Sequence, residues 1–147
     1  MLLYLALLPK EQLATITDIA DSYGISRNHL VKVVHNLASL GYVASLRGKG
    51  GGLRLACDPA KVTIAEVVRH TEPSFDLVEC FRQDGTNTCP ITPICRLKRI
   101  LAEAQQQFIK VLENTTLADV LDEPKALALI LRVSGGDIHS ADGAGEC

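Results

Sequence analysis

The chain has 147 residues, of which 47% are apolar and 4% aromatic, and its formal net charge is −2. This length holds one compact domain, or one small domain with an appendage. Tryptophan is absent and Leu, Ile, Val and Ala must build the core, so the composition favours helices over a β-sandwich. The net charge alone indicates no class of partner.

The first nine residues form an apolar run without any charged side chain. The run lacks the basic start and the small-residue cleavage site of a secretory signal peptide. It is also far shorter than the roughly 20 residues that span a bilayer. We therefore expect a buried helix at this position, and a cytoplasmic protein without a membrane partner.

Two helices joined by a short turn are predicted across residues 16–40. Thr15 or Thr17 is the predicted N-cap of the first helix and Gly24 its left-handed stop, while Ser26 is the predicted N-cap of the second. Apolar residues of the second helix recur at three- and four-residue steps along one face, namely Leu30, Val33, Val34, Leu37 and Leu40. Two helices separated by a glycine-containing turn are typical of a helix-turn-helix.

Charge is distributed unevenly around this predicted motif. Residues 22–57 include five basic residues and two histidines but no carboxylate. A locally cationic surface on a weakly acidic chain favours a polyanionic partner over a merely solvated helix face. Asn pairs with adenine and Arg with guanine in the major groove. We therefore expect contacts to double-stranded DNA from the N-terminal half of the second helix, through Ser26, Arg27, Asn28, His29 and Lys32.

Residues 42–56 alternate like two strands around the glycine-rich connection at 48–52. A phosphate-binding P-loop is the rival interpretation, but its G-x₄-G-K-[ST] pattern is absent and no helix follows directly. A β-hairpin after a helix-turn-helix is a wing, and Arg47 and Lys49 are expected to meet phosphates or a narrow minor groove. Residues 1–72 are thus predicted to be a winged helix-turn-helix domain.

Three of the five cysteines, Cys80, Cys89 and Cys95, fall in residues 73–95, where Gly and Pro predict an irregular loop. Thiolates suit zinc, copper or iron–sulfur clusters. Disulfides and unliganded thiols are the alternatives. Neither a zinc-finger pair nor a ferredoxin run is present, so no standard metal motif supports the metal interpretation. A zinc-stabilised interaction module stays open, whereas the absence of a C-x-x-C pair argues against a thiol redox enzyme.

A long helix is predicted from residue 96, about 28 Å in length at 1.5 Å per residue. Its apolar residues lie along one stripe: Leu97, Ile100, Leu101, Ala104, Phe108, Val111 and Leu112. One small winged domain cannot cover such a stripe, so we expect a homodimer, with packing inside one chain as the alternative. The fold class is therefore mainly α with a small β-hairpin: a winged helix-turn-helix, a dimerisation helix with C-terminal helices over 96–133, and a disordered tail at 134–147.

Three separated stretches, residues 23–32, 47–55 and 89–98, together resemble the NsrR family of nitric-oxide-sensing repressors. That family belongs to the wider iron–sulfur winged-helix regulators that include IscR. The resemblance covers residues 1–133. It implies a homodimeric DNA-binding repressor, not an enzyme, in which Cys80, Cys89 and Cys95 bind the iron of a [4Fe-4S] or [2Fe-2S] cluster. Nitric oxide attacks that cluster in the family, which releases the operator and derepresses nitric-oxide detoxification genes.

Two departures from the family pattern bear on the cluster. The IscR branch carries a histidine three residues after its third cysteine, where this chain has Lys98. The family also has a longer segment before its first helix, which carries an acidic residue and an arginine. If that segment is missing, the resemblance implies the loss of a phosphate contact and of a cluster ligand from the partner chain, with Asp76, Glu79 and Asp84 as the local candidates to replace the ligand. The ligand set leaves open whether the signal is nitric oxide, iron or redox state.

Overall fold

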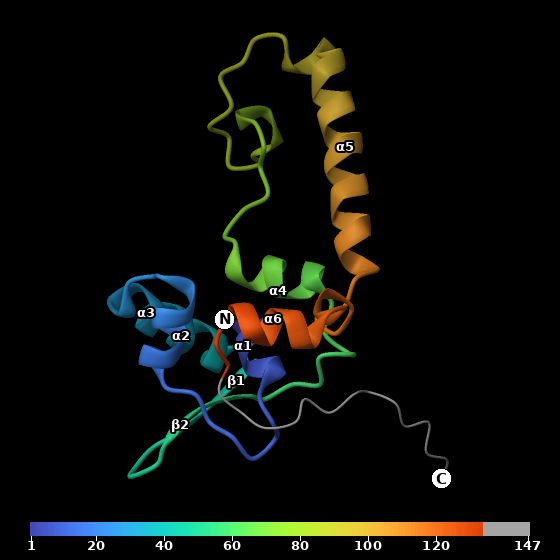
Figure 1. Cartoon of the computed structure of the whole chain (residues 1–147). Helices are drawn as coiled ribbons and strands as arrows, with labels where there is room; N and C mark the ends of the chain where they lie inside the picture. The colour runs from blue at the N-terminus through green and yellow to red at the C-terminus, as the bar shows by residue number, and fades with distance from the viewer. Residues whose placement is uncertain (134–147) are drawn as a thin grey trace. The chain divides into compact units, whose positions relative to one another are not determined.

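The computed structural model describes residues 1–133, and the predicted disordered tail at 134–147 lies outside them. The described chain divides into two compact units (Figure 1), one of residues 1–61 with residues 117–133 and one of residues 62–116. The described part is mainly α with one small antiparallel hairpin, as the composition predicts. No helix in residues 1–133 combines the length and the apolar character needed to cross a membrane.

The first unit begins with helix α1 (Leu2–Leu7). Leu2, Tyr4, Leu5 and Leu7 are all buried, which confirms the expected core helix. Burial also raises the pKa of the Tyr4 hydroxyl above its ordinary value, because the phenolate form loses its hydration. The apolar start of the chain is therefore explained by packing.

Helices α2 (Ile16–Tyr23) and α3 (Arg27–Ser39) form the helix-turn-helix. Thr15 is the N-cap of α2: its Oγ1 accepts the Asp18 N–H at 3.1 Å, and the Asp18 carboxylate accepts the Thr15 N–H at 2.8 Å. Gly24 ends the helix in the left-handed conformation with φ 62°. The two cap signals in the sequence thus define both ends of α2.

Helix α3 packs through the centre of its predicted apolar face. Leu30, Val34 and Leu37 are buried, and Leu30 is 1% exposed. Val33 is half-buried, whereas Leu40 is 36% exposed. Leu40 differs from the expectation because α3 ends at Ser39, so Leu40 is the C-cap residue and lies past the last helical residue.

Strands β1 (Val43–Leu46) and β2 (Gly52–Leu55) pair antiparallel, with Val43 opposite Leu55 and Leu46 opposite Gly52. The segment before α2 extends this hairpin through a bridge between Ala14 and Leu53. The Ala14 N–H donates to the Leu53 carbonyl at 3.0 Å, and the Leu53 N–H donates to the Ala14 carbonyl at 2.7 Å. Strand β2 is therefore attached through Leu53 to the segment that leads into α2.

The C-terminal segment closes the core of the first unit. It contains the 3₁₀ turn η3 (Asp119–Leu121) and helix α6 (Pro124–Ile130). Leu117, Ala128 and Leu131 are buried, and α6 contacts α1. The Ala118 N–H donates to the Pro59 carbonyl at 3.0 Å. This hydrogen bond holds the returning chain beside the end of residues 1–61.

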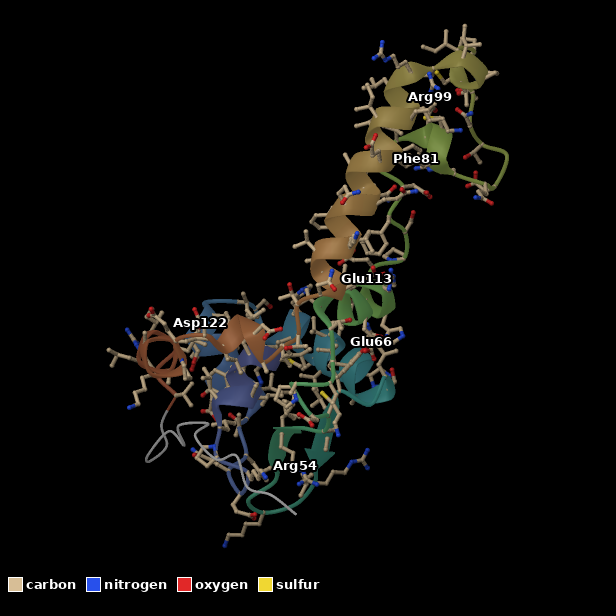
Figure 2. All side chains as sticks on the ribbon, turned by 90° about the vertical axis from the view of Figure 1, so that its right-hand side faces the viewer. Arg54, Glu66, Phe81, Arg99, Glu113 and Asp122 are labelled. Carbon is tan, nitrogen blue, oxygen red and sulfur yellow. The ribbon has the colours of Figure 1, made fainter. Side chains whose placement is uncertain are left out.

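The second unit consists of helix α4 (Ile64–Thr71), a long loop and helix α5 (Arg96–Glu113). The loop has no regular element longer than the 3₁₀ turns η1 (Glu79–Phe81) and η2 (Thr92–Ile94). Thr63 caps α4 and forms a bridge with Thr116, and Arg69 forms an ion pair with Glu113. Figure 2 shows Glu66 on α4 and Glu113 at the C-terminal end of α5. Helix α4 is thus attached to that end of α5.

Replacing Gly52 with Ala is expected to lower the free energy of unfolding by about 1–3 kcal/mol, as overpacking usually does. An added Cβ would lie 2.9 Å from the Ala14 carbonyl oxygen and 2.9 Å from the Leu13 Cβ. The bridge between Ala14 and Leu53 must then loosen. Urea denaturation measures the change. Ser45→Ala, at an exposed position of β1, is the control; equal stability of the two variants would show that the bridge yields without cost.

Candidate functional site

The predicted DNA-contacting residues of α3 share one solvent-facing side. Arg27, Asn28, His29 and Lys32 are all exposed. Ser26 is the N-cap residue and is exposed, but its side chain makes no capping hydrogen bond to the helix. Because Leu30, Val34 and Leu37 are buried on the opposite side, the polar residues face solvent together.

The hairpin carries the other two predicted contacts at its tip. Arg47 and Lys49 are exposed in the connection, where Gly48 and Gly50 adopt φ values of 104° and 82°. The Gly51 N–H closes the turn on the Gly48 carbonyl at 2.9 Å. In Figure 1 both α3 and the hairpin tip project from the left-hand side of the first unit. We call the seven predicted contacts the cationic surface: Ser26, Arg27, Asn28, His29, Lys32, Arg47 and Lys49.

Arg54 is a further basic residue of the hairpin that the list of predicted contacts did not include. It is exposed on β2, directly opposite Ala44, while its neighbour Leu53 is buried. Figure 2 shows Arg54 on the hairpin of the first unit. The alternation of buried and exposed residues in a strand was the signal that could have identified it.

The three loop cysteines are all half-buried, and each occupies a different local structure. Cys80 lies inside η1, and Cys95 is the N-cap residue of α5. Cys89 lies in a turn where its N–H donates to Asn87 Oδ1 at 3.2 Å and its carbonyl accepts the Thr92 hydroxyl at 2.8 Å. They form no disulfide within the described chain.

Cys95 is the cysteine of the three whose sulfur atom accepts a backbone hydrogen bond. Its Sγ accepts a hydrogen bond from the Lys98 N–H at 3.4 Å. The first N–H groups of a helix have no partner within the helix and carry partial positive charge. A sulfur at this position is therefore suited to carry negative charge, as a metal-bound thiolate does.

The three candidate carboxylate ligands have different environments. Asp76 accepts the Ser74 hydroxyl at 2.7 Å. The hydroxyl and the N–H of Thr86 both donate to Asp84, and these hydrogen bonds hold the pKa of Asp84 below its ordinary value. Glu79 lies beside Cys80 in η1. Over residues 1–133, no three His, Cys, Asp or Glu side chains are gathered closely enough to hold a metal ion.

Two hollows adjoin the cysteines. One, of about 360 Å³, is lined by Cys80, Phe81 and Arg82 of the loop and by Lys98 of α5, among others. The other, of about 560 Å³, is lined by Cys95, Lys98 and Arg99. Figure 2 shows Phe81 on the loop and Arg99 on the neighbouring end of α5. Three half-buried soft sulfur donors with cationic neighbours fit a thiolate-bound metal group, although the loop does not bring them together unaided.

Helix α5 has two different faces. Along one face, Leu97, Ile100, Phe108 and Val111 are 60%, 52%, 55% and 64% exposed. Along the other, Lys98, Ala102, Gln105 and Ile109 are half-buried, and the Gln105 side-chain amide donates to the Phe75 carbonyl of the loop. None of the 18 residues of α5 is buried. The predicted apolar stripe thus remains largely open to solvent in the single chain.

Comparison with known proteins agrees with this arrangement. Residues 1–123 match the family Rrf2, which is described as an iron-dependent transcriptional regulator. The HTH-type transcriptional regulator NsrR of Shouchella clausii is 48% identical over 131 residues, which cover 88% of this chain and 87% of that protein. The NsrR of Geobacillus kaustophilus is 45% identical, and the match covers 92% of each chain.

Two solved structures share the fold. IscR of T. potens superposes with a TM-score of 0.66 at 24% identity, covering 86% of this chain and 81% of its own. CymR of B. subtilis superposes with a TM-score of 0.64 at 23% identity, covering 82% and 87%. These similarities confirm the winged-helix fold, and the sequence matches confirm the resemblance to NsrR. The chain therefore belongs to the Rrf2 family of transcriptional regulators.

Proposed function

We propose that this regulator is a homodimeric repressor that binds double-stranded operator DNA and releases it in response to nitric oxide. The sensor is an iron–sulfur cluster held by Cys80, Cys89 and Cys95. The observation that carries the proposal is that the three-cysteine loop runs directly into α5 at Cys95. The helix with the open apolar face therefore begins at a candidate ligand.

The cationic surface supplies the DNA contacts in this proposal. Arg27 and Asn28 lie in the first turn of α3, the end that a recognition helix directs toward base edges. Lys32 and the tip residues Arg47 and Lys49 are suited to phosphate oxygens, which position the protein without reading sequence. The partial positive charge at the N-terminus of α3 also favours phosphate.

The loop supplies the ligands. Three thiolates from Cys80, Cys89 and Cys95 suit a [4Fe-4S] or a [2Fe-2S] cluster, and binding requires the loop to bring Cys80 and Cys89 toward Cys95. When bound, the cluster supplies iron that reacts with nitric oxide. Asp76 and Asp84 each accept hydrogen bonds from Ser74 and Thr86 through one carboxylate oxygen, which leaves the second oxygen available to act as a further ligand.

The open face of α5 is the proposed homodimer contact. Leu97, Ile100, Phe108 and Val111 are each more than half exposed. Apolar side chains that follow one helix face gain about 25 cal/mol for each Å² that a partner removes from water. A second copy presents the same stripe, so two α5 helices related by a two-fold axis can cover each other in a self-complementary contact.

Contacts within the second unit supply the coupling. The Gln105 amide donates to the Phe75 carbonyl, and the Lys98 N–H donates to Cys95 Sγ. The loop is therefore attached to α5 both near the start of the loop, at Phe75, and at its end, at Cys95. A change in the loop therefore acts on the helix where the protomers meet. Two recognition helices then lose the spacing of about 34–36 Å that matches successive major grooves. A loss of about 5–150-fold in operator affinity is typical of such coupling.

An iron- or redox-responsive regulator of the same fold is the second candidate. It is favoured by the description of the matched family as iron-dependent. The two candidates share the cysteines and the DNA surface and differ only in the signal that the cluster receives.

The first test is anaerobic purification followed by visible absorption and operator binding before and after nitric oxide. We expect a brown protein whose spectrum changes with near-stoichiometric nitric oxide and which then releases DNA. A brown protein that is indifferent to nitric oxide but bleached by oxidant or chelator would establish the second candidate. A colourless protein with bound zinc would contradict both and leave a zinc-stabilised module.

Cys80→Ala is expected to lose the cluster and to derepress target promoters, because one of three thiolate ligands is removed. Iron and sulfide content and a promoter reporter measure these effects. Cys57→Ala is the matched control, since Cys57 lies after β2 and outside the loop. Tight repression by Cys80→Ala that nitric oxide does not relieve would refute a role for this cysteine.

On DNA, Asn28→Ala is expected to cost about 1–3 kcal/mol on the operator and to relax specificity at one base position. Lys49→Ala should weaken binding to all sequences alike. It should also reduce the slope of log binding constant against log salt concentration by about one, the contribution of one phosphate contact. Fluorescence anisotropy at several salt concentrations, with operator and scrambled duplexes, separates the two. If Asn28→Ala weakened every duplex equally, Asn28 would not read bases.

Phe108→Glu is expected to raise the dimer dissociation constant about 100-fold. Each of the two Phe108 side chains loses about 1.5 kcal/mol or more of the free energy gained by burial, and a carboxylate is placed in an apolar contact. Sedimentation equilibrium measures the change. Gln107→Glu adds the same charge at the neighbouring exposed residue and serves as control. A fully dimeric Phe108→Glu protein would place the dimer contact elsewhere.

A further inference from the structure

Lys98 differs from the other cations of α5. The helix carries Arg96, Lys98, Arg99 and Lys110, and all of these except Lys98 are exposed. Lys98 is half-buried because it lies one turn before Ala102 on the half-buried face of the helix, which turns toward the loop. The side chain is thus partly withdrawn from water on the side where the cysteines lie.

Lys98 also lies next to two of the cysteines. It lines the hollow that contains Cys80 and the hollow that contains Cys95. Its backbone N–H donates to Cys95 Sγ at 3.4 Å. No other residue lines both hollows among those of the described chain.

The positive charge of Lys98 lacks an anionic partner. Within residues 1–133, no carboxylate lies within ion-pair distance of Lys98. Asp76 lines the Cys80 hollow as well, but its carboxylate accepts the Ser74 hydroxyl at 2.7 Å. The ammonium of Lys98 is therefore available to an anion bound in either hollow.

We propose that Lys98 is a positioning residue whose ammonium offsets the negative charge of the thiolate-bound cluster, holding Cys80 and Cys95 in place and raising the reduction potential of the cluster. The inference rests on the proposed function. Three thiolates give the cluster a negative net charge, and reduction adds one more negative charge. A cation in a partly desolvated position stabilises the reduced form more than the oxidised form. Exposed Arg96 and Arg99 are screened by water and contribute less.

The test compares Lys98→Met, Lys98→Arg and Lys110→Met in the full-length protein after anaerobic cluster reconstitution. Met keeps the length of the side chain and removes the charge, Arg keeps the charge, and Lys110 is an exposed lysine of the same helix. Three quantities are measured: iron and sulfide per chain, the midpoint potential by dithionite titration, and the melting temperature of the cluster-free protein. The last shows that each variant folds.

We expect Lys98→Met to lower the equilibrium constant for one-electron reduction about tenfold, which corresponds to about 59 mV. Lys98→Arg and Lys110→Met should keep the wild-type potential. Loss of the cluster from Lys98→Met alone supports the same role, because only that variant lacks the charge.

An unchanged potential in Lys98→Met with full iron and sulfide content would overturn the inference and leave the proposed function intact. Loss of the cluster from Lys98→Met and Lys98→Arg alike would overturn it too, since the shape of lysine and not its charge would then be needed. Wild-type protein that binds no iron and sulfide would overturn the proposed function and this inference with it.

Discussion

The N-terminus of α5 is the constraint on which the second unit depends. A helix of 18 residues leaves its first N–H groups without partners, and the Sγ of Cys95 accepts one of them. The residue that ends the cysteine loop is therefore also the residue that caps the helix. A ligand bound to this sulfur changes the charge and position of the cap. The contact gives the loop a direct mechanical connection to α5 without any intermediate element.

The order of elements along the chain separates this region from the cationic surface. The second unit, residues 62–116, is inserted in the sequence between the two parts of the first unit. In the first unit the Ala118 N–H donates to the Pro59 carbonyl, and in the second the Ile64 N–H donates to the Thr115 carbonyl. The outgoing and returning chains are thus hydrogen-bonded on either side of the insertion. Each unit therefore has its own backbone hydrogen bond between the outgoing and the returning segment, and these two chain segments connect the units.

Local signals made much of the first unit predictable. Thr15 with Asp18 and Gly24 define the ends of α2, and the glycine-rich connection defines the hairpin, because these residues act on neighbouring backbone groups. Recurring apolar residues identified the buried face of α3, apart from Leu40 at its end. The exposed sides of α3 and the hairpin tip followed from the same periodicity.

Contacts between distant residues were not predictable in this way. The return of α6 to α1 depends on Ala128 and Leu131 meeting a core more than 100 residues earlier in the sequence, and periodicity does not identify such a partner. The half-burial of Lys98 was equally hidden, since it depends on a loop whose path is set by Gln105 and Phe75. Spacing located the cysteines in one loop, but it could not show that Asp76 and Asp84 are held by hydroxyl groups beside them.

The sparse support of α5 bears on its role in the proposed switch. Most helical stability in proteins comes from packing of an apolar face, yet no residue of α5 is buried in the single chain. The helix is held by its cap at Cys95, the Gln105 contact with the loop, the ion pair between Glu113 and Arg69 and the half-buried face that packs against α4. An element with so few supports responds to the loss of any one of them, whereas a helix buried in a core would not. In the proposed homodimer the partner chain covers the exposed apolar face and is a further support, so the state of the loop and the state of the dimer act on the same helix. Under the proposed function, signal and DNA binding are coupled through the stability of this one helix, which requires no continuous pathway of contacts to the recognition helix.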